Sequence, residues 1–276
     1  MVFKKSKIID ILDIKKDSIL NLKGFKNFSQ EILKNENILK TKCKSLNNVL
    51  GGGLYQKVAY LIYGAGKTGK TQLMHQLCVD YLTKQFANKT APCKKVIFFD
   101  TEGTFRPERI TEMVQLFNLN SQKILKQILV SEILSNSALL SSLENLEQSI
   151  NTNNIGLIII DSLNNHFRSE SSSKEISFNQ SKTKFLSILD RITDYINKKR
   201  IYLACTAQIT ESFVQGKVIQ EIPFANQYLN SYFTEYLYLS HYRENKYYAH
   251  LVDSSFFREK RVMFQLTEKG LEDYKI

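Results

Sequence analysis

Short runs of apolar and β-branched residues alternate with longer amphipathic stretches from about residue 45 onward. A short apolar run that ends in polar or glycine-containing residues predicts a buried strand, and an amphipathic stretch between two such runs predicts a crossover helix. The runs that fit the strand pattern are residues 58–63, 96–100, 128–130, 157–161 and 201–206. We therefore predict an α/β fold with a mostly parallel central sheet.

The pattern changes after Pro223. Residues 235–239, 246–253 and 261–267 follow one another as strand-like runs without a helical stretch between them. This arrangement predicts antiparallel hairpins that extend the sheet at its C-terminal end. Before this change, residues 178–199 place apolar side chains every three or four positions, as a helix with one buried face does.

The first part of the chain differs from the rest in charge. Residues 1–50 carry eleven lysines against five acidic residues, which accounts for more than half of the net charge of +11. Their apolar residues are spaced as in short helices, with a turn at Gly24. We predict a basic helical arm over residues 1–44, which is either a solvated linker or a contact to DNA backbone, and one large core domain over residues 45–276.

The whole chain of 276 residues has 38 Lys and Arg against 27 Asp and Glu. This balance favours a polyanionic partner such as nucleic acid. We expect no membrane association, because the apolar runs fall far short of the roughly 20 residues that cross a bilayer. The four cysteines contain no C-x-x-C pair, so we expect a reducing intracellular compartment and no structural zinc.

One stretch carries a specific chemical motif, G-x-x-x-x-G-K-[ST], between a predicted strand and a predicted helix. The residues that match it are Gly64, Ala65, Gly66, Lys67, Thr68, Gly69, Lys70 and Thr71. In such a loop the main-chain N–H groups surround phosphate oxygens, Lys70 reaches the β and γ oxygens, and the Thr71 hydroxyl ligates Mg²⁺. The sequence therefore predicts a site for a nucleoside triphosphate and Mg²⁺.

The same stretch also satisfies G-x-G-x-x-G, the motif of dinucleotide-binding proteins. In that interpretation Asp100, at the end of the next strand, would bind the ribose. However, Asp100 lies 31 residues after Gly69, whereas the motif expects about 20. A dinucleotide site also has no use for Lys70 and Thr71, so a dinucleotide-binding oxidoreductase is only a remote alternative.

Three polar residues at strand ends complete the predicted nucleotide site. Asp161 ends the apolar run 157–161, where nucleotide hydrolases place a second carboxylate that organises Mg²⁺. Glu102 follows the strand at 96–100 and has the chemistry to orient or deprotonate water. Gln208 follows the strand at 201–206, and we predict that its amide senses the γ-phosphate and signals to the next loop.

Residues 100–110 read D-T-E-G-T-F-R-P-E-R-I and resemble the signature of the RadA recombinases of archaea and their eukaryotic counterparts, which are relatives of RecA. The resemblance covers residues 45–276 nearly without gaps. It implies a RecA-type ATPase core that binds ATP and Mg²⁺. In this core Glu102 is the water-activating acid, Arg109 stacks on adenine, and Gln208 is the γ-phosphate sensor.

The resemblance also implies partners. It predicts subunits stacked around single-stranded or double-stranded DNA, either with copies of this chain or with other recombinase-family subunits, and with ATP at the interface between them. By the same resemblance we expect the nucleus as the location in a eukaryote and the cytoplasm in an archaeon.

The chain departs from the family where DNA and the neighbouring subunit are expected. The family's first DNA-facing loop carries a Gly-Arg-Gly element. Residues 171–176 here read S-S-S-K-E-I, so that Lys174 is their one cation and the glycines are missing. The second loop, residues 209–222, has Lys217 against Glu211 and Glu221. Because affinity for nucleic acid depends on neutralised phosphates, a net negative loop binds them poorly. In addition, Ala207 replaces the usual Asn, and Ser255 replaces a Pro that caps the neighbour's adenine.

Two interpretations of these departures remain open. In the one we favour, the chain is an accessory paralogue that binds ATP and assists or regulates a filament without performing strand exchange itself, or else it is a divergent strand-exchange recombinase. In the alternative, it is a fully active, filament-forming recombinase that catalyses strand exchange. Both place it in homologous recombination and DNA repair. The candidate DNA-contacting residues are Arg168, Lys174, Lys182, Lys184 and Lys217.

Overall fold

The computed structural model describes residues 37–88, 92–115, 117, 119–151, 154–173, 175–211 and 221–274. All of them belong to one compact unit, Asn37–Ile276. The predicted arm over residues 1–44 lies outside the described residues except for residues 37–44.

A nine-stranded sheet with the order β13-β12-β11-β10-β3-β7-β6-β4-β5 forms the framework of this unit. Its parallel strands are β3 (Ala59–Tyr63), β4 (Lys95–Asp100), β5 (Ile128–Glu132), β6 (Ile155–Asp161), β7 (Tyr202–Ala207) and β10 (Glu235–Arg243). Its antiparallel extension consists of β11 (Lys246–Ser254), β12 (Lys260–Thr267) and β13 (Gly270–Asp273). The predicted parallel core with antiparallel C-terminal hairpins is therefore confirmed.

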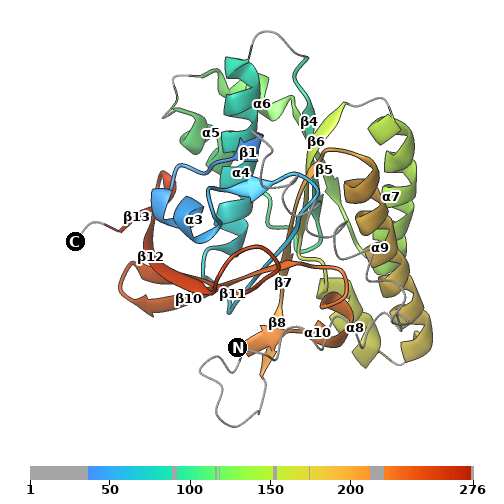
Figure 1. Ribbon diagram of the computed structural model, residues 1–276. Helices are drawn as coiled ribbons and strands as arrows, with labels where there is room; N and C mark the ends of the chain where they lie inside the picture. Colours follow the sequence, from blue (N-terminus) through green and yellow to red (C-terminus); the bar gives the residue numbers. More distant parts are fainter. Residues whose placement is uncertain are drawn as a thin grey trace, which may run out of the picture. The chain divides into compact units, whose positions relative to one another are not determined.

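Helices cover both faces of the sheet. Figure 1 shows the pair α7 and α9 on one side and the group α4, α5 and α6 on the other. Their bounds are α4 (Lys70–Ala87), α5 (Pro107–Gln115), α6 (Ser121–Leu125), α7 (Asn136–Asn151) and α9 (Phe178–Lys198). The predicted helix at 178–199 is α9. Among the described residues, no helix is long and apolar enough to span a membrane.

Short elements complete the unit. The short helices are α3 (Lys44–Val49), α8 (Asn165–Ser172) and α10 (Asn226–Leu229). Strands β1 (Ile38–Leu39) and β2 (Leu54–Tyr55) pair with each other, and β8 (Ile209–Glu211) forms an antiparallel hairpin with β9 (Glu221–Pro223). The strands of this last hairpin lie at the two ends of residues 209–222, with β9 ending one residue beyond them, and the sequence pattern predicts no strand there.

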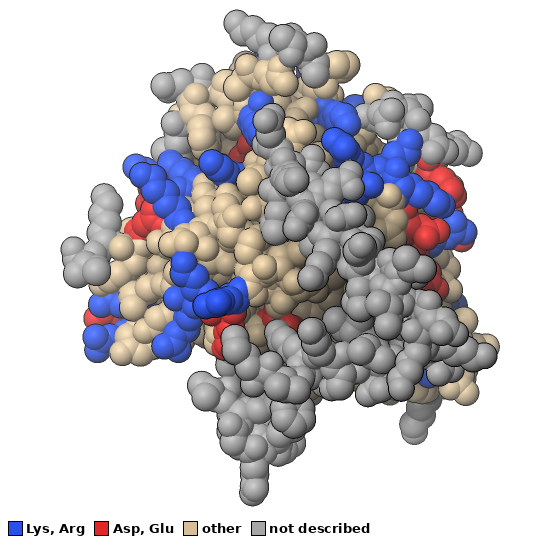
Figure 2. Space-filling view, viewed as in Figure 1, with Lys and Arg blue, Asp and Glu red and all other residues tan. Residues whose placement is uncertain are grey.

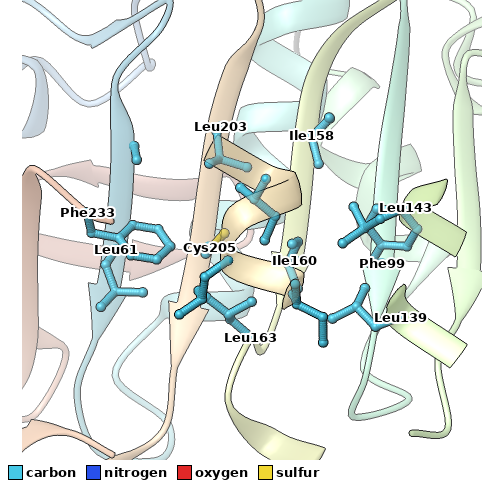
Figure 3. Packing of buried hydrophobic residues seen from close by; sticks show 14 of the residues in the cluster. Leu61, Phe99, Leu139, Leu143, Ile158, Ile160, Leu163, Leu203, Cys205 and Phe233 are labelled. Carbon is cyan, nitrogen blue, oxygen red and sulfur yellow. The ribbon is translucent and has the colours of Figure 1, made fainter. Parts of the chain in front are cut away.

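The core between the sheet and the helices α7 and α9 explains why the parallel strands read as continuous apolar runs. Ile158 and Ile160 of β6 and Leu203 of β7 belong to the same buried cluster as Leu139 and Leu143 of α7 (Figure 3). The other face of the sheet is covered as well, and all seven residues of β6 are buried. A strand covered on both faces needs apolar side chains at every position and can place polar ones only at its end.

A buried carboxylate lies where the parallel part of the sheet meets the antiparallel part. Glu235 begins β10 and pairs with Tyr60 of β3 and Ser254 of β11. It is fully buried, and its Oε1 accepts a hydrogen bond of 3.1 Å from the main-chain N–H of Ser255. Burial raises the pKa of this carboxyl from 4.5 to about 7, although hydrogen bonds from residues 254–256 oppose the rise.

We expect Glu235 to make the fold less stable as the pH rises. The folded protein holds the proton of Glu235 more tightly than the unfolded chain does, so the free energy of unfolding falls between pH 4.5 and about 7. Glu235→Gln removes this titration. Relative to the wild type, the variant should gain up to about 3 kcal/mol between pH 4.5 and pH 8 in urea unfolding. A difference that does not change with pH would contradict this expectation.

Candidate nucleotide-binding site

The predicted phosphate loop connects β3 with α4 and depends on glycine for its shape. Gly64 has a φ of 149°, and a Cβ atom at this position would lie 2.0 Å from the carbonyl oxygen of Leu239. Gly69, with a φ of 97°, forms the N-terminal cap of α4. The loop therefore ends at the N-terminus of a long helix, where unpaired N–H groups and the helix dipole favour an anion.

Lys70 is the first residue of α4, and its side chain folds back over the loop. Its Nζ donates hydrogen bonds to the carbonyl oxygens of Gly64 at 2.9 Å and Ala65 at 2.8 Å. Burial lowers the pKa of Lys70, and the nearby carboxylates of Asp161 and Glu102 oppose this effect. The ammonium group is thus held at the mouth of the loop. A cavity of about 230 Å³ opens beside it, lined by Lys67, Gly69, Lys70, Thr71, Gln72 and Leu266.

Asp161 and Thr71, the two predicted Mg²⁺ ligands, lie close together. Asp161 ends β6 and is 2% exposed, and its Oδ1 accepts a hydrogen bond from the Thr206 hydroxyl. Its Oδ2 is buried without a well-formed hydrogen bond, although the Thr71 hydroxyl is near enough to lower the pKa of the carboxyl. Burial has the larger effect and raises this pKa. A buried carboxylate oxygen without a partner, next to a hydroxyl, fits a hard cation such as Mg²⁺.

Glu102 and Gln208 are also brought together, as expected. Glu102 Oε1 accepts hydrogen bonds from the Ser162 hydroxyl at 2.6 Å and from Gln208 Nε2 at 3.0 Å. Gln208 Nε2 also donates to Asn165 Oδ1 at 2.9 Å. A second cavity of about 490 Å³ is bordered by Glu102, Gln208 and Asn165. The carboxylate is therefore fixed at the rim of the sheet by side chains from two other strand ends.

The loop that carries Glu102 is organised by Asp100. The Oδ1 of Asp100 accepts hydrogen bonds from the main-chain N–H groups of Glu102 at 3.2 Å and Thr104 at 3.0 Å, and its Oδ2 accepts one from Phe105 at 2.9 Å. The side chain is only 5% exposed. Both carboxylate oxygens are thus engaged by the loop. This arrangement gives the residue a structural role and does not favour the dinucleotide alternative, in which it would bind a ribose.

His75 of α4 links the same loop to the phosphate loop. Its Nε2 accepts a hydrogen bond of 3.0 Å from the main-chain N–H of Arg106, and its Nδ1 donates to the carbonyl oxygen of Thr71 at 2.9 Å. Burial lowers the pKa of His75 to about 4. The ring is therefore neutral near pH 7, as this pairing of one acceptor with one donor requires.

Arg109 lies beside the first cavity but is tied to protein groups. Its guanidinium donates to the carbonyl oxygens of Thr267 at 2.6 Å and Glu268 at 2.5 Å, and to Gln72 Oε1 at 2.6 Å. It also forms an ion pair of 2.7 Å with Glu112. Because Gln72 borders the cavity at the phosphate loop, the location agrees with the expected nucleotide site, while stacking on adenine stays a prediction.

Two of the predicted DNA-contacting residues lie near the hairpin β8–β9. The guanidinium of Arg168 donates to the carbonyl oxygen of Ile209 at 3.1 Å and lies 5.8 Å from the ring centre of Phe224. The ammonium of Lys182 lies 5.3 Å from the ring centre of Tyr228. Both cations therefore lie over aromatic rings of the segment that follows the hairpin.

The other predicted DNA contacts do not join this group among the described residues. Lys184 donates to the Ser137 hydroxyl of α7 at 2.8 Å, on a different side of α9 from Lys182. Lys174 and Lys217 lie outside the described residues. On the face shown in Figure 2, the described Lys and Arg side chains lie in separate groups with acidic side chains among them.

Several residues of the site were missed by sequence reasoning. They are His75, Ser162, Asn164 and Asn165. Their signals were present but not specific. His75 lies one helical turn after Thr71, and the others directly follow Asp161, where polar residues after a buried strand indicate the sheet rim. Their partners belong to segments far away in sequence, so their roles could not be assigned.

The strand–loop–helix at Gly64–Thr71 and the carboxylate at the end of β6 define a P-loop nucleotide-binding protein with a RecA-type core. Residues 33–274 match the Rad51 family, and the chain belongs to this family, whose members are ATPases. The RadA protein of Methanococcus voltae, named "DNA repair and recombination protein RadA", is 30% identical over 251 residues, which are 85% of this chain and 76% of the relative. A protein of the same name from Methanococcus maripaludis is 29% identical over 91% of this chain and 81% of its own length. The expected family and fold are therefore confirmed.

Gly64 and Gly66 of the phosphate loop should differ in how well they tolerate substitution by alanine. Gly64→Ala should lower the free energy of unfolding by at least about 2 kcal/mol, because the new Cβ would overlap the Leu239 carbonyl. A Cβ at Gly66 meets no atom within 4 Å, so Gly66→Ala should unfold within about 0.5 kcal/mol of the wild type. Urea unfolding of both variants tests this, and equal stabilities would contradict the described loop.

Proposed function

We propose that this chain is a Mg²⁺-dependent ATPase that assists recombination as an accessory subunit. It is a DNA repair and recombination protein of the RecA family, as the Methanococcus relatives are by name. The observation that supports the ATPase assignment is that Lys70, Asp161 and Glu102 lie close together at one end of the sheet. There, burial lowers the pKa of Lys70 and raises that of Asp161, and the charges of these three groups influence one another.

Each residue has a role that follows from its position. The main-chain N–H groups of the loop and the Lys70 ammonium bind the triphosphate, and Thr71 and Asp161 would hold Mg²⁺. When bound, Mg²⁺ draws negative charge from the phosphate oxygens. Glu102 accepts a proton from water at its carboxylate, and the hydrogen bonds from Ser162 and Gln208 fix its direction. Gln208 presents a neutral amide at the same rim, where we place the γ-phosphate sensor.

The accessory role is supported by the charges at the hairpin β8–β9. Glu211 and Glu221 lie directly opposite each other in its register, and Tyr238 donates a hydrogen bond of 2.9 Å to Glu221. Like charges in such a pair weaken the hairpin and repel phosphate groups. A strand-exchange enzyme is the second candidate, favoured by the cations of Arg168 and Lys182 beside the hairpin.

Binding and hydrolysis of ATP should separate in two variants. Glu102→Gln should keep the Kd for ATP and lower kcat by about 100-fold or more, because the amide cannot accept the proton of water. Lys70→Ala should weaken ATP binding by roughly 10- to 100-fold, because it removes a charged donor. Fluorescent nucleotide titration and phosphate release measure the two quantities. Unchanged binding in Lys70→Ala would refute the site, and equal loss of both in Glu102→Gln would give Glu102 a structural role.

The accessory role should appear in DNA assays with the purified chain and ATP. We expect binding to single-stranded DNA that weakens steeply as salt rises, and no joint molecules in a strand-exchange assay. Arg168→Ala combined with Lys182→Ala should weaken binding, whereas Lys198→Ala serves as the control, since Lys198 pairs with Asp194 at the other end of α9 and is not a candidate DNA contact. Joint molecules formed by the pure protein would contradict the accessory role and favour the strand-exchange enzyme.

A further inference from the structure

We propose that Asn164 and Asn165 are positioning residues that couple the nucleotide site to the hairpin β8–β9. Neither side chain is among the residues assigned to ATP, Mg²⁺ or DNA. The proposal rests on the proposed ATPase function, because it concerns how Gln208 is held beside Glu102. Asn164 is fully buried, and Asn165 is half-buried at the rim of the second cavity.

The carboxamide of Asn164 joins the two ends of the hairpin. Its Oδ1 accepts a hydrogen bond of 2.8 Å from the main-chain N–H of Gln208, just before β8. Its Nδ2 donates to the carbonyl oxygens of Gln208 at 3.0 Å and Phe224 at 2.9 Å, the latter just after β9. The main-chain N–H of Phe224 donates to the carbonyl of Gln208 at 2.8 Å. Asn164 therefore clamps the base of the hairpin from the N-terminal cap of α8.

The carboxamide of Asn165 joins the Gln208 side chain to the loop that carries Glu102. Its Nδ2 donates to the carbonyl oxygen of Thr101 at 2.8 Å, which turns its Oδ1 toward Gln208 Nε2 at 2.9 Å. Because a carbonyl can only accept, the contact with Thr101 fixes which end of the Asn165 amide faces Gln208. Asn165 thus ties the predicted sensor to the residue next to the predicted water-activating acid.

These contacts leave the Gln208 amide little freedom. Its Nε2 donates to Glu102 and to Asn165, and its two protons are thereby engaged. A turn of this amide toward a phosphate must break one of the two bonds. If the bond to Glu102 breaks, Asn165 keeps the amide at the site, and Asn164 transmits the displacement of the Gln208 main chain to both ends of the hairpin. Two adjacent asparagines on one helix end therefore connect the carboxylate, the sensor and the hairpin.

The direct test is Asn165→Ala in the full chain, because this half-buried position should tolerate truncation better than Asn164. We expect the Kd for ATP to stay within about 2-fold, while kcat falls by about 3- to 10-fold, the loss expected from one positioning hydrogen bond. The exposed residue Asn179 of α9 provides the matched control, Asn179→Ala, which should leave both quantities unchanged. An unchanged kcat in Asn165→Ala would overturn the proposal.

A double-mutant cycle distinguishes positioning from a general structural effect. If Asn165 acts through Gln208, then Asn165→Ala combined with Gln208→Ala should be no slower than Gln208→Ala alone. Purely additive losses would overturn the proposal. The cycle also works without nucleotide, since the coupling of the two side chains should appear in the free energy of unfolding even if the chain hydrolysed no ATP.

Hydrogen exchange of the β8 and β9 amides tests the coupling itself. In the wild type, a non-hydrolysable ATP analogue should change their exchange rates. Asn164→Ala, and the milder Asn164→Ser if the first variant is unstable, should reduce this change. If the Asn164 substitution changed the exchange rates of these amides equally with and without the analogue, Asn164 would have a merely structural role and the proposal would be overturned. Failure of the proposed function looks different, because the wild type would then bind no ATP while the cycle of Asn165 with Gln208 kept its coupling.

Discussion

The burial of the parallel strands on both faces is the constraint on which the rest of this structure depends. Along β3, β4, β6 and β7 nearly every side chain is buried, so polar groups are confined to the places where the strands end. Because the strands are parallel, these ends lie at one edge of the sheet. Asp100 and Asp161 end two of these strands and Gln208 directly follows a third, so the fold brings together at that edge three residues that are far apart in sequence.

At this edge the buried polar groups depend on one another. Asp100 satisfies main-chain amides of the loop after β4, and His75 satisfies the next one in its neutral form. The charged groups are less well compensated, since burial lowers the pKa of Lys70 and raises that of Asp161. In the proposed function, the triphosphate and Mg²⁺ offset these two costs, which ties the electrostatics of the site to its ligand.

Sequence patterns located most of the sheet correctly because they rest on local chemistry. Every predicted strand is present, and β6, predicted at 157–161, begins two residues earlier. The patterns missed the hairpin β8–β9, whose strands have three residues each and carry Glu211 opposite Glu221. They also missed β13, which is a short strand at the edge of the sheet. Short, polar or edge strands bury too little apolar surface to leave a periodic signal.

The sequence by itself determined the phosphate loop, the fold class and the family, because each is encoded in consecutive residues or in a regular spacing. Only the tertiary structure decided which polar side chains serve the site. In it, Asp100 accepts hydrogen bonds from loop amides, and Lys184 contacts α7 instead of lying beside Lys182. Asn164 and Asn165 form hydrogen bonds with Gln208. The hydrogen bonds of Lys184, Asn164 and Asn165 connect residues that are tens of positions apart, and their geometry exists only after the strands and helices have packed.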